Sequence, residues 1–115
     1  MPARQQHRGG LAAKATLFSA LGDETRLTLV AKLGKGKRYS ISELTEGTKL
    51  TRQAVTKHLR VLEKVRIVHR KRAGRESLFE LDPQPMHDLS VYLETVSKQW
   101  DAALARLKAL VEEPD

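Results

Sequence analysis

The fold of this chain is decided by residues 51–75, TRQAVTKHLRVLEKVRIVHRKRAGR, which predict a helix followed by the start of a basic β-hairpin. Nine basic residues in this stretch are opposed by a single acidic one, Glu63, so it carries +8, whereas the whole chain carries +7. Residues 1–50 carry +5 and residues 76–115 carry −6. A positive charge concentrated on one helix and one hairpin indicates a polyanionic partner, because a charge that only maintained solubility would be spread evenly.

The predicted helix has one narrow apolar stripe. Val55, Leu59 and Leu62 recur at i, i+4 and i+7 and predict a buried face, and the Thr51 hydroxyl is placed to cap the first turn. The opposite face carries side chains suited to the major groove of B-DNA, where Gln pairs with adenine, Arg or Lys with guanine, and Thr meets the thymine methyl. Four residues are expected to approach base edges: Arg52, Gln53, Thr56 and Lys57.

A second short helix is predicted just upstream, over residues 41–48, with Ser42 as its cap and Leu44 facing inward. A tight turn over residues 48–50 joins it to the Thr51 helix. Two short helices with such a connection form a helix-turn-helix, in which the second helix reads the bases.

A β-hairpin is predicted downstream, from strands at residues 67–72 and 77–81 joined by a turn that contains Gly74. Its basic tip would lie beside the groove-reading helix as a wing. His58 lies between the two faces of that helix, where packing or phosphate contact is favoured over metal binding. Seven residues are expected to meet phosphates: Thr51, His58, Arg60, Arg70, Lys71, Arg72 and Arg75.

Length and composition exclude several classes of protein. The 115 residues predict a mobile N-terminal arm over residues 1–10 and a single domain over residues 11–115. The absence of cysteine excludes disulfides, thiolate metal sites and cysteine nucleophiles. No signal peptide or membrane-spanning run is visible, so a cytoplasmic protein with no membrane partner is expected. No arrangement typical of a catalytic site is present, so an enzyme is not expected.

Two helices are predicted in the N-terminal part. Residues 11–21 carry apolar side chains at helical spacing, and Asp23 is placed to cap a second helix that runs to Leu33. In that second helix, Leu27, Val30 and Leu33 are expected to face the core.

A long C-terminal helix is predicted over about residues 85–111. Its apolar residues advance by alternating steps of three and four from Met86 to Leu110, which is a heptad seam. A core helix of a monomer is the alternative, but a seam this long in a short chain favours a homodimer. The residues expected at the dimer interface are Leu11, Ala15, Phe18, Leu93, Val96, Trp100, Leu104 and Leu107.

Three segments together resemble the ArsR/SmtB family of bacterial winged-helix repressors. Residues 17–27, LFSALGDETRL, are similar to the family's opening motif, residues 50–63 to its recognition helix, and residues 72–83 to its wing and exit. The resemblance covers about residues 14–107 in the correct order. It implies a homodimer, joined through the first and last helices, that binds operator DNA and represses transcription.

The chain departs from the metal-sensing members of that family. Ser40 and Ser42 stand where those members carry a Cys-x-Cys motif, and the last helix offers only His87 of the family's second metal site. Because serine is a poor ligand for soft ions, no metal or other cofactor is expected. Arg66 stands where the family usually has glycine, which implies mild strain or a different exit from the recognition helix.

The sequence therefore predicts a mainly α fold with a small β-hairpin wing, that is, a winged helix-turn-helix whose partners are double-stranded DNA and a second copy of itself. One alternative is a winged helix used as a protein–protein interaction module. Another is a repressor that responds to a ligand or metal through an unrecognised site. The operator, the regulated genes and any small-molecule inducer are not specified, and neither is the choice between repressor and activator.

Overall fold

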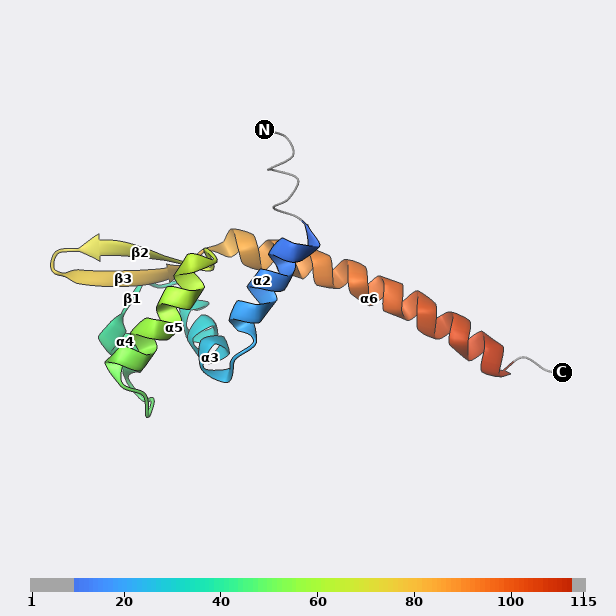
Figure 1. Ribbon diagram of the computed structural model, residues 1–115, viewed down its shortest axis with the longest axis horizontal. Coiled ribbons are helices and arrows are strands. Elements are labelled where there is room, and N and C mark those ends of the chain that lie inside the picture. The colour runs from blue at the N-terminus through green and yellow to red at the C-terminus, as the bar shows by residue number, and fades with distance from the viewer. Residues whose placement is uncertain (1–9, 113–115) are drawn as a thin grey trace, which may run out of the picture.

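The computed structural model describes residues 10–112 and confirms the predicted fold class (Figure 1). The described residues form five helices and three strands, and the N-terminal arm predicted over residues 1–10 lies almost wholly outside them. In chain order the elements are α2 (Leu11–Leu21), α3 (Glu24–Leu33), β1 (Tyr39–Ser40), α4 (Ile41–Thr45), α5 (Arg52–Lys64), β2 (Val68–Ala73), β3 (Glu76–Leu81) and α6 (Pro83–Glu112).

The described part of the chain contains a three-stranded antiparallel sheet, one strand more than the predicted hairpin. Strands β2 and β3 pair from Val68 opposite Leu81 to Ala73 opposite Glu76, and Gly74 in the turn has a φ of 65°. The additional strand, β1, pairs with β3 on its other side and makes the order β1-β3-β2. A two-residue strand is too short to show the alternation by which strands are found in a sequence.

The core forms where α3, α4, α5 and the sheet meet. The predicted stripe of α5, Val55, Leu59 and Leu62, is completely buried there, as is Leu44 of α4. The prediction for α3 was partly wrong, because Leu27 is 52% exposed. The buried pair in α3 is Leu29 and Leu33, one helical turn apart, and Leu27 lies about 200° around the helix from Leu29.

Helix α4 begins at Ile41 as expected but ends at Thr45, three residues before the predicted end, and Ser42 is not its cap. The N-cap is Ser40, whose hydroxyl accepts a hydrogen bond from the Glu43 amide at 3.1 Å. The Glu43 carboxylate accepts in return from the Ser40 amide at 2.8 Å, which completes a capping box. The backbone amides of Ser40 and Glu43, at the start of this short helix, therefore each have a hydrogen-bond partner. Asp23 caps α3 as predicted, by accepting from the Arg26 amide at 3.0 Å.

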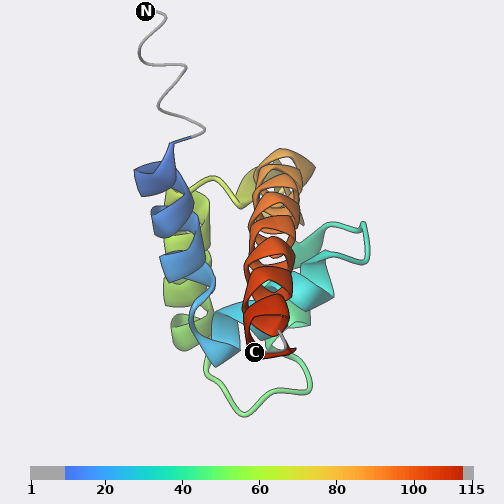
Figure 2. The ribbon, with the colours of Figure 1, turned by 90° about the vertical axis from the view of Figure 1, so that its right-hand side faces the viewer.

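Helix α6 leaves the body and extends well beyond it, as Figures 1 and 2 show. Its 30 residues make a rod about 45 Å long. Of the described residues of α6, Leu89 alone is buried. Tyr92 contacts α2, where its ring centroid lies 6.2 Å from that of Phe18 and the Lys14 ammonium lies 5.5 Å from its centre. Beyond this point most of the apolar seam is exposed.

Helix α5 ends in a left-handed turn at Arg66, which has a φ of 67°. The Ile67 amide donates to the Leu62 carbonyl and the Arg66 amide to the Glu63 carbonyl, each at 3.0 Å, which is the Schellman pattern. Ile67 and Leu62 are both completely buried, so the apolar contact that accompanies this motif is present. The exit is the one that glycine normally makes, with an arginine in its place.

We expect Arg66→Gly to raise the free energy of unfolding by about 0.5–1 kcal/mol. A left-handed conformation costs a non-glycine residue roughly 1–2 kcal/mol, and the greater freedom of glycine in the unfolded chain offsets part of that gain. Urea unfolding measures the change. Lys64→Gly is the matched control, since the same substitution at the last residue of α5 should lower stability by up to about 1 kcal/mol. If both substitutions destabilise equally, the left-handed turn carries no strain.

Candidate nucleic-acid interface

The outer face of α5 is a continuous polar and cationic surface. Arg52, Gln53, Lys57 and Arg60 are exposed, and Thr56 beside them is half-buried. None of the three cations forms an ion pair with another residue between positions 10 and 112. This face borders an open depression of about 560 Å³, and the residues that line it are Ile41, Thr51, Arg52, Gln53, Ala54, Thr56, Lys57 and Arg60. The predicted base-contact residues therefore share one accessible surface.

Two hydroxyls on this surface already serve the helix. Thr51 caps α5 as predicted, because its oxygen accepts from the Ala54 amide at 3.0 Å. The Thr56 hydroxyl donates to the Arg52 carbonyl at 2.7 Å. Thr51 keeps its hydroxyl hydrogen for an outside acceptor, whereas Thr56 retains its methyl group and oxygen lone pairs. The two threonines thus offer an incoming ligand different chemical groups.

The turn between α4 and α5 is tightly hydrogen-bonded. The Thr48 hydroxyl donates to the Thr45 carbonyl at 2.6 Å and accepts from the Leu50 amide at 3.2 Å. Gly47 has a φ of 80°, which only glycine adopts at low cost, and this turn position was not predicted from the sequence. From α3, the Lys32 ammonium donates to the Glu43 carbonyl at 2.8 Å. These bonds hold the two helices of the helix-turn-helix in one arrangement.

The basic residues of the wing form two groups, one near its base and one toward its tip. Near its base, Arg70 pairs with Glu63 at 3.5 Å, and Lys71 pairs with Glu80 at 3.2 Å. The hydrogen bonds that Arg38 and then Lys71 donate to Glu80 hold the pKa of that carboxyl below its usual value. Toward the tip, Arg72 and Arg75 are exposed and make no ion pair with any described residue.

The wing and the N-terminal end of α5 project to the same side of the molecule, at the left of Figure 1, away from α6. Opposite residues of an antiparallel pair lie on the same face of the sheet, so Arg72, opposite Ser77, lies on the face that carries the buried Phe79. Arg72 at the wing tip and the cations of α5 therefore lie on elements that project to the same side of the molecule.

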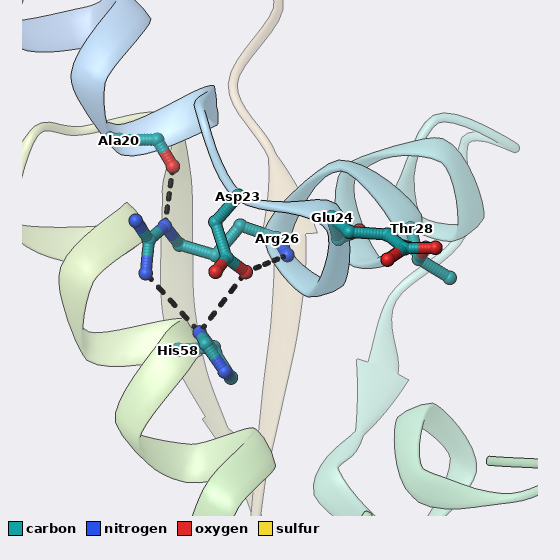
Figure 3. Close-up of polar contacts among 6 residues, drawn as sticks. All are labelled: Ala20, Asp23, Glu24, Arg26, Thr28 and His58. Carbon is teal, nitrogen blue, oxygen red and sulfur yellow. Dashed lines mark hydrogen bonds and ion pairs between the residues drawn. The ribbon is translucent and has the colours of Figure 1, made fainter.

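His58 lies on α5 but faces the body instead of the outer surface. Its side chain is 24% exposed, and its Nδ1 atom lies 3.3 Å from an Arg26 guanidinium nitrogen and 3.8 Å from an Asp23 carboxylate oxygen (Figure 3). The packing role considered for His58 agrees with this position. Arg26 was missed in the sequence, where its place three residues after a helix cap was the available signal. His69 is exposed as expected of a strand residue of the wing.

His69 also pairs with Asp82, a contact that the sequence did not predict. The His69 Nε2 atom lies 2.6 Å from one Asp82 carboxylate oxygen, and the other oxygen accepts from the Gln84 amide at 2.9 Å. The Asp82 amide donates to the Ile67 carbonyl at 2.8 Å. The Gln84 amide, and then His69, keep the pKa of the Asp82 carboxyl below its usual value. This joint connects the wing to the start of α6.

Residues 10–112 include neither a membrane-spanning helix nor a cluster of metal ligands. No helix within residues 10–112 combines the length and apolar composition that crossing a bilayer requires. The same residues contain no group of three or more His, Cys, Asp or Glu side chains that could hold a metal ion. His87 is exposed in the first turns of α6. The expectation that the protein binds no metal stays a prediction.

The helix-turn-helix followed by a hairpin wing defines a winged helix-turn-helix protein. A family model described as "Bacterial regulatory protein, arsR family" matches residues 23–70. An uncharacterized HTH-type transcriptional regulator of Bacillus subtilis, YuzN, is 34% identical over 82 residues, which cover 66% of this chain and 89% of that protein. The HTH-type transcriptional regulator Rv2034 of Mycobacterium tuberculosis is 32% identical over 95 residues, covering 83% and 85%. The chain belongs to the ArsR family of bacterial regulatory proteins.

Solved structures agree with this assignment. An ArsR-like transcriptional regulator from Rhodococcus sp. RHA1 superposes with a TM-score of 0.74 at 32% identity and covers 90% of this chain and 96% of its own. A winged helix-turn-helix domain of Mb0332 from Mycobacterium bovis, described as homodimeric, has a TM-score of 0.60 at 19% identity and covers 84% and 85%. At that identity the second likeness shows the fold alone.

We expect stability to fall at acid pH. The folded state lowers the pKa values of Asp23, Glu80 and Asp82, so it favours their ionised forms. Their contribution is complete above the unfolded values near pH 4 and is lost as the pH falls through the lower folded values. Urea unfolding at pH 7 and pH 3 tests this. Asp82→Asn should lower stability at pH 7 and reduce the loss at pH 3, whereas Asp101→Asn on the exposed part of α6 should change neither. Equal losses in wild type and Asp82→Asn would contradict the prediction.

Proposed function

We propose that this chain is a transcriptional repressor that binds a palindromic operator as a homodimer. The observation that supports this most directly is the face of α5, where an exposed amide and three cations that pair with no described residue line one open surface beside the wing. Double-stranded DNA offers a groove that admits one helix and phosphates that flank it. A winged helix that served only as a protein–protein module would have no need of this cationic surface.

The proposal divides the surface into base-reading and phosphate-binding parts. Arg52, Gln53, Thr56 and Lys57 lie on the outer face of α5 and are assigned to base edges. Among the residues assigned to phosphates, Arg72 and Arg75 rank first, because no described carboxylate competes for them. Thr51 and Arg60 rank next. Arg70 and Lys71 rank lower, since each must exchange a carboxylate partner for a phosphate.

The dimer is proposed from the apolar surface that one copy leaves uncovered. Leu93, Trp100, Leu104 and Leu107 of α6 are each at least half exposed, and Leu11 of α2 is 69% exposed. Contiguous apolar surface of this kind marks an interaction site in soluble proteins. The homodimeric description of the Mycobacterium bovis domain supports the same assembly here. A two-fold axis would place the two α5 helices on half-sites about one DNA turn apart.

The division of labour on DNA can be tested with two substitutions. Gln53→Ala should relax specificity by about 1–3 kcal/mol at one base pair of each half-site, because an amide pairing with a base edge is lost. Arg72→Ala should weaken binding to every sequence and reduce the slope of log K against log salt by about two, one phosphate for each subunit. Gel shifts against the chain's own promoter region over a range of salt concentrations measure both effects.

A remote cation serves as the control for these gel shifts. Lys98→Ala removes a positive charge from α6, where Glu94 is its ion-pair partner among residues 10–112, and should leave both affinity and salt slope unchanged. If Arg72→Ala keeps full affinity at physiological salt, the assignment of the wing to phosphates is wrong. If no variant and no wild-type protein shifts the promoter DNA, the proposed function itself fails.

The dimer can be tested at Trp100, which is 63% exposed in a single copy and is the largest apolar side chain of the seam. Trp100→Asp should dissociate the dimer, because a buried aromatic anchor is replaced by a charge. Sedimentation should give twice the 12.9 kDa chain mass for wild type and the monomer mass for the variant. Gln99→Asp adds the same charge at the neighbouring position and should remain dimeric. A wild-type protein that is monomeric at tens of micromolar yet protects a palindrome would refute the proposal.

A further inference from the structure

Arg26 connects three elements through one guanidinium group. Its Nε atom donates to the Ala20 carbonyl in the last turn of α2, and its terminal nitrogen contacts Nδ1 of His58 on α5 at 3.3 Å (Figure 3). Its own backbone amide donates to the Asp23 cap at the start of α3. The guanidinium plane is rigid, so the two side-chain contacts cannot be adjusted independently. The end of α2 and the middle of α5 are thereby held at a set separation.

The contact between Arg26 and His58 requires a neutral imidazole. A guanidinium only donates hydrogen bonds, so Nδ1 of His58 must accept and the ring hydrogen must be on Nε2. Among the described residues, the charged groups within 4 Å of the His58 ring nitrogens are those of Arg26 and Asp23. Nδ1 lies closer to Arg26 than to Asp23, at 3.3 Å against 3.8 Å. Protonation of Nδ1 would place two cations, the His58 imidazolium and the Arg26 guanidinium, against each other. The imidazolium would be attracted to the Asp23 carboxylate instead.

The other contacts of α5 set the face that it buries, but the contacts along its core-facing side are mostly apolar. Val55, Leu59 and Leu62 anchor it through a narrow apolar stripe, and hydrophobic burial is non-directional. A hydrogen bond to a side chain beside that stripe is directional, so it restricts turning of the helix about its axis. Such turning would move Gln53 and Lys57, which lie five residues and one residue before His58 on the same helix, relative to any ligand on the outer face.

We propose that Arg26 and His58 are positioning residues for DNA binding, which fix the recognition helix α5 against α2 and so against the dimer interface. This inference rests on the proposed function. It assigns His58 no contact with DNA, in contrast to the phosphate role predicted for it. Its consequence is that the orientation of α5, and with it operator affinity, depends on the hydrogen bond between Arg26 and His58.

The matched substitutions are His58→Asn and His58→Leu. Asparagine places a carbonyl oxygen where Nδ1 stands and can accept from Arg26, whereas leucine has a similar branched shape with no acceptor. We expect His58→Leu to weaken operator binding at least tenfold with the salt slope unchanged, and His58→Asn to recover most of that loss. His87→Asn, at an exposed histidine of α6, should bind as wild type does. Circular dichroism and sedimentation establish that each variant is folded and has the wild-type oligomeric state.

One further readout separates positioning from a general structural role. In a double-mutant cycle, Arg26→Lys should weaken binding in the wild-type background and have much less effect when His58 is already leucine. Lysine keeps the positive charge, but it lacks the fork that reaches both Ala20 and His58.

Several outcomes would overturn the inference. A salt slope that becomes shallower in His58→Leu would mean that His58 contacts phosphate. Equal affinities for the leucine variant and wild type, or additive effects of Arg26→Lys and His58→Leu, would mean that the contact does not position α5. Failure of the proposed function looks different, because wild-type protein would then bind no operator DNA at any salt concentration or pH.

Discussion

The structure depends on the burial of one side of α5 by three aliphatic residues. Val55, Leu59 and Leu62 have no exposed surface and meet α3, α4 and the sheet. Because the stripe is narrow, the rest of the helix circumference stays free for polar side chains, and the Schellman exit at Arg66 turns the chain directly into the wing. The same stripe therefore forms the core and presents the outer face. A wider apolar face would have buried the positions assigned to bases.

Most elements could be predicted because their signals are local. The apolar spacing of α5, the cap at Asp23 and the heptad seam of α6 each follow from side chains close together in the sequence, and all three were found. What could not be predicted depends on pairing between distant residues. Strand β1 exists because Tyr39 meets Phe79, and neither the Arg26 to His58 contact nor the His69 to Asp82 contact leaves a periodic pattern. The exposed Leu27 shows that an apolar residue at helical spacing does not specify which helix face meets the core.

The sequence predicted which residues form the candidate site but no order among them. The ion pairs in the structure support an order among the residues proposed to contact phosphates. Exposure alone does not separate Arg70 and Lys71 from Arg72 and Arg75, since all four are exposed wing residues. The carboxylates of Glu63 and Glu80 separate them, because only the structure shows that these acids lie within 4 Å of the first pair. An ion pair at the wing base also gives the hairpin a preferred position before any ligand arrives.

The joint at Asp82 has a consequence for the length of a DNA site. Three hydrogen bonds at this residue connect the wing strand, the segment after α5 and the first turn of α6. In a dimer held together by α6, this joint would set the distance between the two wings. One additional base pair between half-sites moves them apart by about 3.4 Å and rotates them by about 34°. If these hydrogen bonds keep each wing fixed relative to α6, the dimer cannot follow this translation and rotation. The protein would then distinguish DNA sites by the number of base pairs between the half-sites.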